Sequence, residues 1–223
     1  MAEVTIYGVI FSHFTRKVLM ACEEKGIDYE NEPIYPAQLP EDLARHTPMK
    51  KIPFARIGDR WLADSRVINE YLEGLYPEPA LCPSAPWDRA RARWYEEYID
   101  GWVVPNTGPK LFYQRVVKPV FLGKTGDESI VQEAINTDLP PIFDYLEGEI
   151  NAREFMVSNS LSSADISIGS WFVNIRDIDI EIDTERWPNL SAYVDRLHRR
   201  PSLKKLIGSQ AEFFQRLRES AGA

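Results

Sequence analysis

Residues 77–86 read PEPALCPSAP, and this stretch divides the chain into two parts with different sequence patterns. Four of its ten residues are proline, which fixes the backbone and removes a hydrogen-bond donor at each position. Such a segment is typical of a stiff linker between domains. We therefore expect a first domain over residues 1–76, a linker over residues 77–86 and a second domain over residues 87–223.

The part before the linker alternates strand and helix signals. Val4–Tyr7 is a short run of β-formers, and apolar residues then recur at helical spacing from Phe14 until Gly26 ends the helix. The same reasoning predicts a strand at 29–34, a short helix at 41–46, a hairpin over 54–63 and a helix with an apolar stripe over 67–75. The predicted order is strand, helix, strand, helix, strand, strand, helix.

The part after the linker carries helical patterns only. We expect helices over 87–104, 128–150, 162–176 and 190–197, and a last helix that begins near Pro201. Pro105 and Pro109 should kink or break the first of these helices, and the Pro140-Pro141 pair inside the second has no explanation from the pattern. Together the two parts predict an α/β thioredoxin-like N-terminal domain joined to an all-α C-terminal domain.

Composition excludes several classes of function. The 223 residues are 44% apolar and 27% charged, as in ordinary globular proteins, and carry a formal net charge of −8. This acidity disfavours nucleic acid as a partner, because sequence-independent binding needs cations that displace counterions. No apolar run reaches the length of a membrane span, so we expect no membrane partner.

The cysteines and histidines indicate a reducing compartment and no metal site. Cys22 and Cys82 form no CxxC pair, and the three histidines are too far apart in the sequence for zinc-ligand spacing. The start, Met1-Ala2-Glu3-Val4, lacks the basic and apolar regions of a secretory signal. We therefore expect a cytoplasmic protein whose thiols are buried or half-buried, and no metal cofactor.

Short motifs along the chain resemble those of one family, the cytosolic glutathione transferases of the serine type. Residues 12–18 (SHFTRKV), 47–53 (TPMKKIP) and 64–65 (DS) are similar to the family's S-P-x-x-R-K-V, N-P-x-G-K-V-P and E-S or Q-S motifs. Residues 162–165 (SSAD), 187–190 (WPNL) and 200–202 (RPS) are similar to its S-x-A-D, P-N-L and R-P motifs. His13, Thr47 and Lys50 depart from the usual proline, asparagine and glycine, and no class within the family is assigned.

The resemblance implies that glutathione is the co-substrate and suggests which residues hold it. Ser12 would donate a hydrogen bond to the sulfur. A cis bond between Ile52 and Pro53 would turn the Ile52 backbone toward the cysteinyl unit of the peptide. The other contacts would be Lys51 to the glycyl carboxylate, Asp64 to the ammonium group, and Ser65 at a helix N-terminus to the γ-glutamyl carboxylate.

One serine hydroxyl is about sufficient to activate the thiol. A free thiol has a pKa of roughly 8.5, so only a few per cent is thiolate at neutral pH. Lowering that pKa by about two units requires about 2.7 kcal/mol of preference for the anion. A hydrogen bond to a charged group supplies about 1.5–3 kcal/mol.

Each assignment has an alternative. Ser12 and Ser65 could merely cap helices, and Lys51 could be a solvated surface residue. Tyr7, at the end of the first strand, is a rival thiol activator, because some transferase classes use a tyrosine there. The aromatic residues of the second part could line a pocket for the second substrate or belong to its core: Trp94, Tyr98, Trp102 and Tyr113.

Two functions remain open at this stage. The first is a glutathione transferase that activates the thiol for attack on a small electrophile, and that pairs as a homodimer as its family does. The second is a non-catalytic binding module on the same fold, as in the stringent starvation proteins, which share a Ser-His pair at the position of Ser12-His13. Fold by itself does not decide between them.

Overall fold

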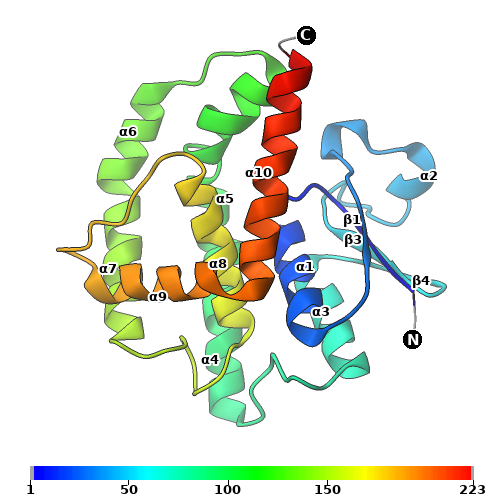
Figure 1. The fold of residues 1–223 in the computed structure, drawn as a ribbon, viewed down its shortest axis with the longest axis horizontal. Coiled ribbons are helices and arrows are strands. Elements are labelled where there is room, and N and C mark those ends of the chain that lie inside the picture. The colour runs from blue at the N-terminus through cyan, green and yellow to red at the C-terminus, as the bar shows by residue number, and fades with distance from the viewer. Residues whose placement is uncertain (1–2, 222–223) are drawn as a thin grey trace. The chain divides into compact units, whose positions relative to one another are not determined.

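The structure, a computed structural model, describes residues 3–221. Its internal contacts divide the chain into two compact units: residues up to Leu81 together with those from Arg200 onward, and Cys82–Arg199. Figure 1 shows the elements of both units. By its contacts, the last helix therefore belongs to the unit that contains the N-terminal residues. The sequence pattern places it in the second domain, expected over residues 87–223. The boundaries of the domains themselves stay a prediction.

The first unit combines a four-stranded sheet with helices. Its elements are β1 (Val4–Tyr7), α1 (His13–Lys25), β2 (Glu30–Glu32), the 3-10 helix η1 (Pro36–Gln38), α2 (Glu41–Ala44), β3 (Phe54–Ile57), β4 (Arg60–Ala63), α3 (Ser65–Leu75) and α10 (Pro201–Ala221). The strand order is β2-β1-β3-β4, with β1 parallel to β2 and antiparallel to β3. The expected thioredoxin-like order of elements is confirmed.

Local sequence signals explain where α1 begins and ends. Ser12 caps its N-terminus, and Gly26 ends it in the left-handed conformation with φ 62°. The helix packs against α3 and α10, and Figure 1 shows α10 beside it. Val18 and Leu72 are fully buried in this unit, as is Ile6 of β1. The core of the unit therefore lies between the sheet and its helices.

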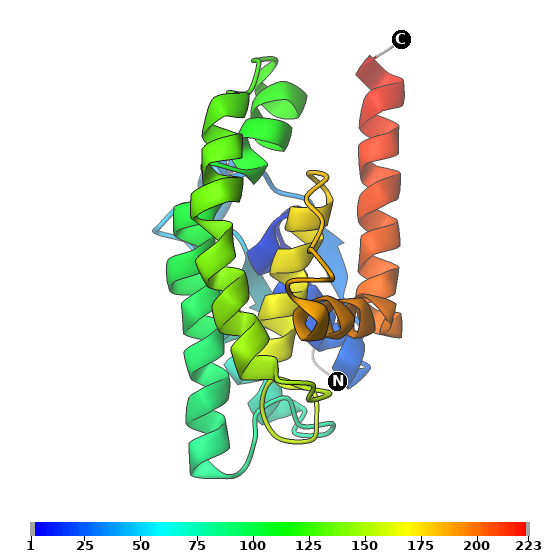
Figure 2. The same cartoon turned by 90° about the vertical axis from the view of Figure 1, so that its left-hand side faces the viewer.

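The second unit is entirely helical. Its elements are α4 (Pro86–Glu97), the π-helix η2 (Tyr98–Val103), α5 (Val104–Thr107), the π-helix η3 (Tyr113–Phe121), α6 (Glu128–Thr137), α7 (Leu139–Ile150), α8 (Ser163–Arg176) and α9 (Pro188–Arg199). Helix α8 packs on α4 and α9, and α7 on α6 and α9. In Figure 2 the long α4 and the α6–α7 pair run alongside each other. None of the helices within residues 3–221 combines the length and apolar character needed to cross a membrane.

The expectation that Pro105 and Pro109 kink or break the long helix is confirmed at Pro109, because α5 ends at Thr107 and residues 108–111 form turns. The chain changes from α to π geometry at Tyr98, and Pro105 then lies in the first turn of α5. Main-chain bonds continue past Pro109, from Leu111 N to Thr107 O at 2.9 Å and from Tyr113 N to Gly108 O at 3.0 Å. Pro105 therefore stays within a helix, whereas at Pro109 the chain passes through turns before η3 begins at Tyr113.

The Pro140-Pro141 pair also finds its explanation. The expected helix over 128–150 is two helices, and the pair occupies the first turn of the second, α7. Proline suits that turn because the N–H groups there have no partner within the helix.

Candidate functional site

Ser12 lies at the N-terminus of α1 and keeps part of its surface open. It is half-buried, and its Oγ accepts a hydrogen bond from Thr15 N at 3.4 Å. Its own N–H donates to Val9 O at 3.0 Å, which closes the turn between β1 and α1. Among the residues that the structure describes, none accepts the Ser12 hydroxyl hydrogen. Ser12 is therefore a helix cap that can still donate to a ligand.

Gly8 brings this loop close to the segment that contains Ile52. The glycine has φ 152°, and a Cβ placed on it would lie 2.4 Å from Thr15 Oγ1 and 3.3 Å from Ile52 Cβ. The first distance is shorter than any normal contact, so the missing side chain is what lets the three residues approach. The turn before Ser12 and the backbone at Ile52 are consequently neighbours.

Tyr7, the rival activator, has a packing role in the sheet. Its ring stacks on Phe54 with centroids 4.8 Å apart and planes inclined by 4°, and on Trp61 at 5.4 Å. Tyr7 and Phe54 are directly opposite each other in the β1–β3 pairing. Cross-strand aromatic pairs of this kind stabilise sheets, which accounts for a tyrosine at this position without catalysis.

The segment before β3 is organised by Thr47. The Thr47 hydroxyl donates to Lys51 O at 2.7 Å and accepts from Lys51 N at 3.2 Å, and the side chain is buried. Lys51 itself is exposed. The Ile52–Pro53 bond is cis, as expected, and Pro53 directly precedes β3. Thr47, which departs from the asparagine of the family motif, therefore ties its own side chain to both main-chain groups of Lys51.

Lys50 occupies the position where the family motif has glycine. Its φ is 52°, in the left-handed region that favours glycine, and its N–H donates to Thr47 O at 2.7 Å. The backbone therefore keeps the turn that the motif requires despite the larger residue. His13, the other departure near Ser12, is buried with its ring edge against Phe14 at 4.9 Å.

Asp64 and Ser65 open α3 beside Pro53. Asp64 Oδ1 accepts from Arg66 N at 2.9 Å and from Val67 N at 3.4 Å, and Asp64 N donates to Pro53 O at 3.4 Å. Both cap bonds use one carboxylate oxygen, so the other, on an exposed side chain, is available to an ammonium group. Ser65 is only 3% exposed.

The backbone at Asp64 is strained. Its φ of 81° lies where non-glycine residues are rare, which costs about 1–3 kcal/mol. Such strain persists only where the surroundings enforce it, and it concentrates at functional sites. The first unit thus gathers Ser12, the Lys51–Pro53 segment and Asp64-Ser65 through neighbouring backbone contacts.

The aromatic residues expected near the second substrate lie in the other unit. The Tyr98 ring stacks on Trp94 at 6.2 Å and on Trp102 at 5.5 Å, and these three rings are named here the aromatic ladder. Trp94 and Trp102 are about half exposed, at 49% and 50%. Tyr113 is 39% exposed and has Lys118 Nζ 5.9 Å from its ring, and among residues 3–221 its ring makes no contact with the ladder.

The switch from α to π geometry keeps the ladder on one face. Residues four apart drift by about 40° around an α-helix. In the wider π turn that begins at Tyr98, each residue advances the helix by a smaller angle. The offset between Tyr98 and Trp102 therefore has the opposite direction to the offset between Trp94 and Tyr98. Burial and the nearby Tyr145 raise the pKa of Tyr98 to about 12, so its hydroxyl stays protonated at neutral pH.

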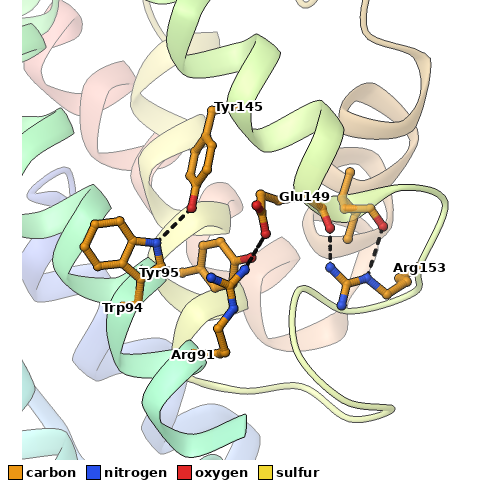
Figure 3. Close-up of polar contacts among 7 residues, drawn as sticks. Arg91, Trp94, Tyr95, Tyr145, Glu149 and Arg153 are labelled. Atoms are coloured by element: carbon orange, nitrogen blue, oxygen red, sulfur yellow. Dashed lines mark hydrogen bonds and ion pairs between the residues drawn. The ribbon is translucent and has the colours of Figure 1, made fainter. Parts of the chain in front are cut away.

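Figure 3 shows what holds the ladder against α7. Trp94 Nε1 donates to the Tyr145 hydroxyl at 2.8 Å, and Arg91 and the Tyr95 hydroxyl both donate to Glu149. Arg153 caps the end of α7 through the carbonyl oxygens of residues 149 and 150. Arg91 on α4 is therefore paired with a carboxylate of its own chain.

Neither the Cys22 thiol nor a metal cluster adds to the chemistry of the described residues. Burial, with a smaller contribution from Glu23, raises the pKa of the Cys22 thiol to about 12, so it is not a nucleophile at neutral pH. Within residues 3–221 no cluster of histidine, cysteine and carboxylate side chains could hold a metal ion.

Comparison with known proteins places these features in a family. Residues 6–80 match the family described as glutathione S-transferase, N-terminal domain, and residues 112–210 match its C-terminal domain. A probable glutathione S-transferase parC from Nicotiana tabacum is 29% identical, with 99% of this chain and 97% of the relative covered.

Solved structures agree. A glutathione S-transferase from Rhodospirillum rubrum F11 has a TM-score of 0.83 at 23% identity, covering 92% of this chain and 91% of the other. Glutathione S-transferase I with bound lactoylglutathione has a TM-score of 0.80 at 25% identity, covering 93% and 99%. With both domains matched over most of its length, the chain belongs to the glutathione S-transferase family.

Proposed function

We propose that this chain is a glutathione transferase in which Ser12 activates the glutathione thiol for attack on a small electrophile. The observation that carries the proposal is the half-exposed Ser12 hydroxyl, whose hydrogen no described residue accepts. It stands at a helix N-terminus, where backbone N–H groups and the helix dipole favour an anion. A thiolate placed there would receive the hydroxyl hydrogen bond and the field of α1 together.

The chemical step needs little else from the protein. The thiol proton leaves to solvent, and the Ser12 hydroxyl donates to the sulfur anion. The sulfur then forms a bond to the electrophilic atom, while a leaving group such as halide departs with the electron pair of its own bond. With an activated alkene, the electron pair of the double bond moves to carbon, which takes up a proton from solvent. The hydrogen bond lowers the thiol pKa, which raises the fraction of nucleophile at neutral pH.

The peptide would lie along the neighbouring backbone. Lys51 is exposed and can meet the glycyl carboxylate, while the main chain at Ile52, next to Pro53, can pair with the cysteinyl unit. Asp64 offers a carboxylate oxygen to the ammonium group, and the first turn of α3 at Ser65 offers N–H groups to the γ-glutamyl carboxylate.

Exposed apolar side chains support one proposal for the second-substrate site and another for the assembly. The aromatic ladder with Tyr113 supplies apolar surface that suits an organic electrophile.

Trp87 on α4 and Val67 on α3 are exposed, at 74% and 46%, and would be covered in a twofold homodimer. Light scattering should then give twice the chain mass, and a value near 25.7 kDa at micromolar concentration would contradict the dimer. The free thiols of Cys22 and Cys82 suit a cytoplasmic location.

The test separates activation from binding. Ser12→Ala should lower kcat by about ten- to a hundredfold, as one lost charge-assisted hydrogen bond predicts, with little change in glutathione affinity by calorimetry. Ser65→Ala should weaken binding first. If the wild type neither binds glutathione nor consumes its thiol with aromatic halides, hydroperoxides or activated alkenes, the enzyme proposal fails. The non-catalytic alternative has no observation in its favour.

A further inference from the structure

The turn that carries Ser12 is held by a helix from the far end of the sequence. Arg16 in α1 is fully buried and donates through Nη1 to Ile10 O at 3.2 Å and to Gln210 Oε1 in α10. Gln210 is 1% exposed and lies 194 positions after Arg16. The carbonyl two residues before Ser12 is thus tied to α10 through one guanidinium group.

The residue directly before Ser12 is held by the same helix. The Phe11 ring is 8% exposed and packs against Phe213 and Phe214 of α10, with centroids 5.6 Å away in each case. The Tyr35 ring also contacts Phe11, with centroids 6.2 Å apart. Side chains of α10 therefore hold Phe11 directly and Ile10 through Arg16.

We propose that Gln210, Phe213 and Phe214 are positioning residues for the transferase reaction, which set where the Ser12 hydroxyl meets the sulfur. The inference rests on the proposed function of Ser12. None of the three touches the reacting atoms. They act through Arg16 and Phe11, which fix the backbone on the N-terminal side of Ser12.

Elementary hydrogen-bond physics explains why this matters. A hydroxyl bond to an anion loses strength steeply with distance and misalignment. Displacement of a catalytic group by about 1 Å can cost on the order of a hundredfold in rate. The Ser12 main chain bonds to Val9 O at 3.0 Å and accepts from Arg16 N at 2.9 Å, but among the described residues its hydroxyl has only the long cap bond from Thr15. Support for residues 10 and 11 from outside the turn therefore adds to what fixes the hydroxyl.

The chain offers a matched control on the same helix. Lys205 Nζ pairs with Glu23 at 2.6 Å, and Arg200 and Ser202 bond to Glu24. These contacts dock α10 on the C-terminal end of α1, remote along the helix from Ser12. Lys205→Gln therefore disturbs docking of α10 without touching the supports of Ser12.

The experiment compares Gln210→Leu, the pair Phe213→Leu/Phe214→Leu and Lys205→Gln with wild type and Ser12→Ala. Measurements are kcat, KM for glutathione, the pH profile of thiolate absorbance in the glutathione complex, and the unfolding midpoint. We expect Gln210→Leu and the double variant to lose about three- to thirtyfold in kcat, to keep KM within about twofold, and to form thiolate only at higher pH. Gln210→Glu, which keeps an acceptor for Arg16, should restore most of kcat.

The outcomes are distinct. One outcome is that the Gln210 and phenylalanine variants keep the wild-type kcat and thiolate profile while Ser12→Ala is still slow. That outcome would overturn the inference and leave the proposed function intact. Equal loss in Lys205→Gln would also overturn it, because helix docking alone would then be the cause. Wild-type kcat in Ser12→Ala would remove the proposed function itself. If Gln210→Leu does not fold, the double variant decides the question alone.

Discussion

Two helices of this protein begin at a serine cap, α1 at Ser12 and α8 at Ser162, and the two caps differ in how fully they are used. Ser162 is completely buried, and both its N–H and its hydroxyl donate to Asp165 Oδ2 at 2.8 Å. Asp165 also accepts from Met156 N and the Tyr193 hydroxyl, each at 2.7 Å. Ser12 has one long cap bond and an open hydroxyl.

The contrast separates structural from chemical use of the same residue. A cap whose donors and acceptors are all satisfied inside the protein can only stabilise the fold. A cap that remains partly exposed and keeps its hydrogen can act on a ligand. Thr15 stands at the third helical position of α1, where α8 has Asp165, so no carboxylate at that position of α1 accepts the Ser12 hydroxyl hydrogen.

The largest loss of stability should come from the cap of α8, whose polar groups are all hydrogen-bonded inside the protein. Asp165→Ala would leave several buried donors without an acceptor, and we expect a loss of about 3–5 kcal/mol in the free energy of unfolding, measured by urea denaturation. Asp127→Ala at the exposed start of α6 is the matched control and should lose much less. Similar losses at both positions would contradict the distinction between the caps.

Replacing each of the two serines by alanine should separate the effect on kcat from the effect on the free energy of unfolding. Ser12→Ala should slow kcat as proposed above while costing only about 0.5–1 kcal/mol of unfolding free energy. Ser162→Ala should lose about 1–2 kcal/mol and keep kcat within about twofold. A Ser162→Ala protein that stays folded but is catalytically slow would break the comparison.

The other end of α1 gives a pH-dependent effect of smaller size. Burial acts to raise the pKa of Glu24, but hydrogen bonds from Arg200 and Ser202 outweigh it and hold that pKa below 4.5. Because the folded value is lowered, the stabilisation is present above the unfolded value and is lost as pH falls through the folded one. Glu24→Gln should therefore differ most from wild type near neutral pH in unfolding free energy, and the difference should shrink below about pH 4.5. A difference that grows on acidification would contradict this assignment.

The smallest effect is expected at Tyr7. Tyr7→Phe keeps the ring that stacks on Phe54 and Trp61, so kcat and stability should stay within about twofold and 0.5 kcal/mol of wild type. Loss of activity in steady-state assays of this variant would make Tyr7 the activator in place of Ser12.

Short-range signals predicted much of the fold. Val4–Tyr7 is the first strand with the expected bounds, Ser162 and Asp165 form the expected capping box, and α10 begins at Pro201. These features depend on residues within a few positions of one another, which is the range over which propensity and capping act. The cis bond at Ile52–Pro53 followed from the motif.

The rest depends on contacts that local patterns do not encode. The π turn after Glu97 has no counterpart in the apolar pattern, and the pairing of Arg91 with Glu149 joins residues 58 positions apart. At the site, the cap alternative is right for Ser12 and wrong for Ser65, because Asp64 caps α3 and Ser65 is its first helical residue. The roles of these residues toward glutathione stay predictions. The support of Ser12 by Gln210 joins residues near opposite ends of the chain, and no spacing rule reaches that far.

That long separation has a consequence for biosynthesis. Translation at about 5–20 residues per second leaves roughly 10–40 seconds between synthesis of Arg16 and of Gln210, 194 positions later. During that interval Arg16 lacks its Gln210 acceptor and the Phe11 ring lacks Phe213 and Phe214. The N-terminal unit can therefore complete its packing only after translation has passed residue 214, so a nascent chain stalled earlier should remain more open to proteases than the finished protein.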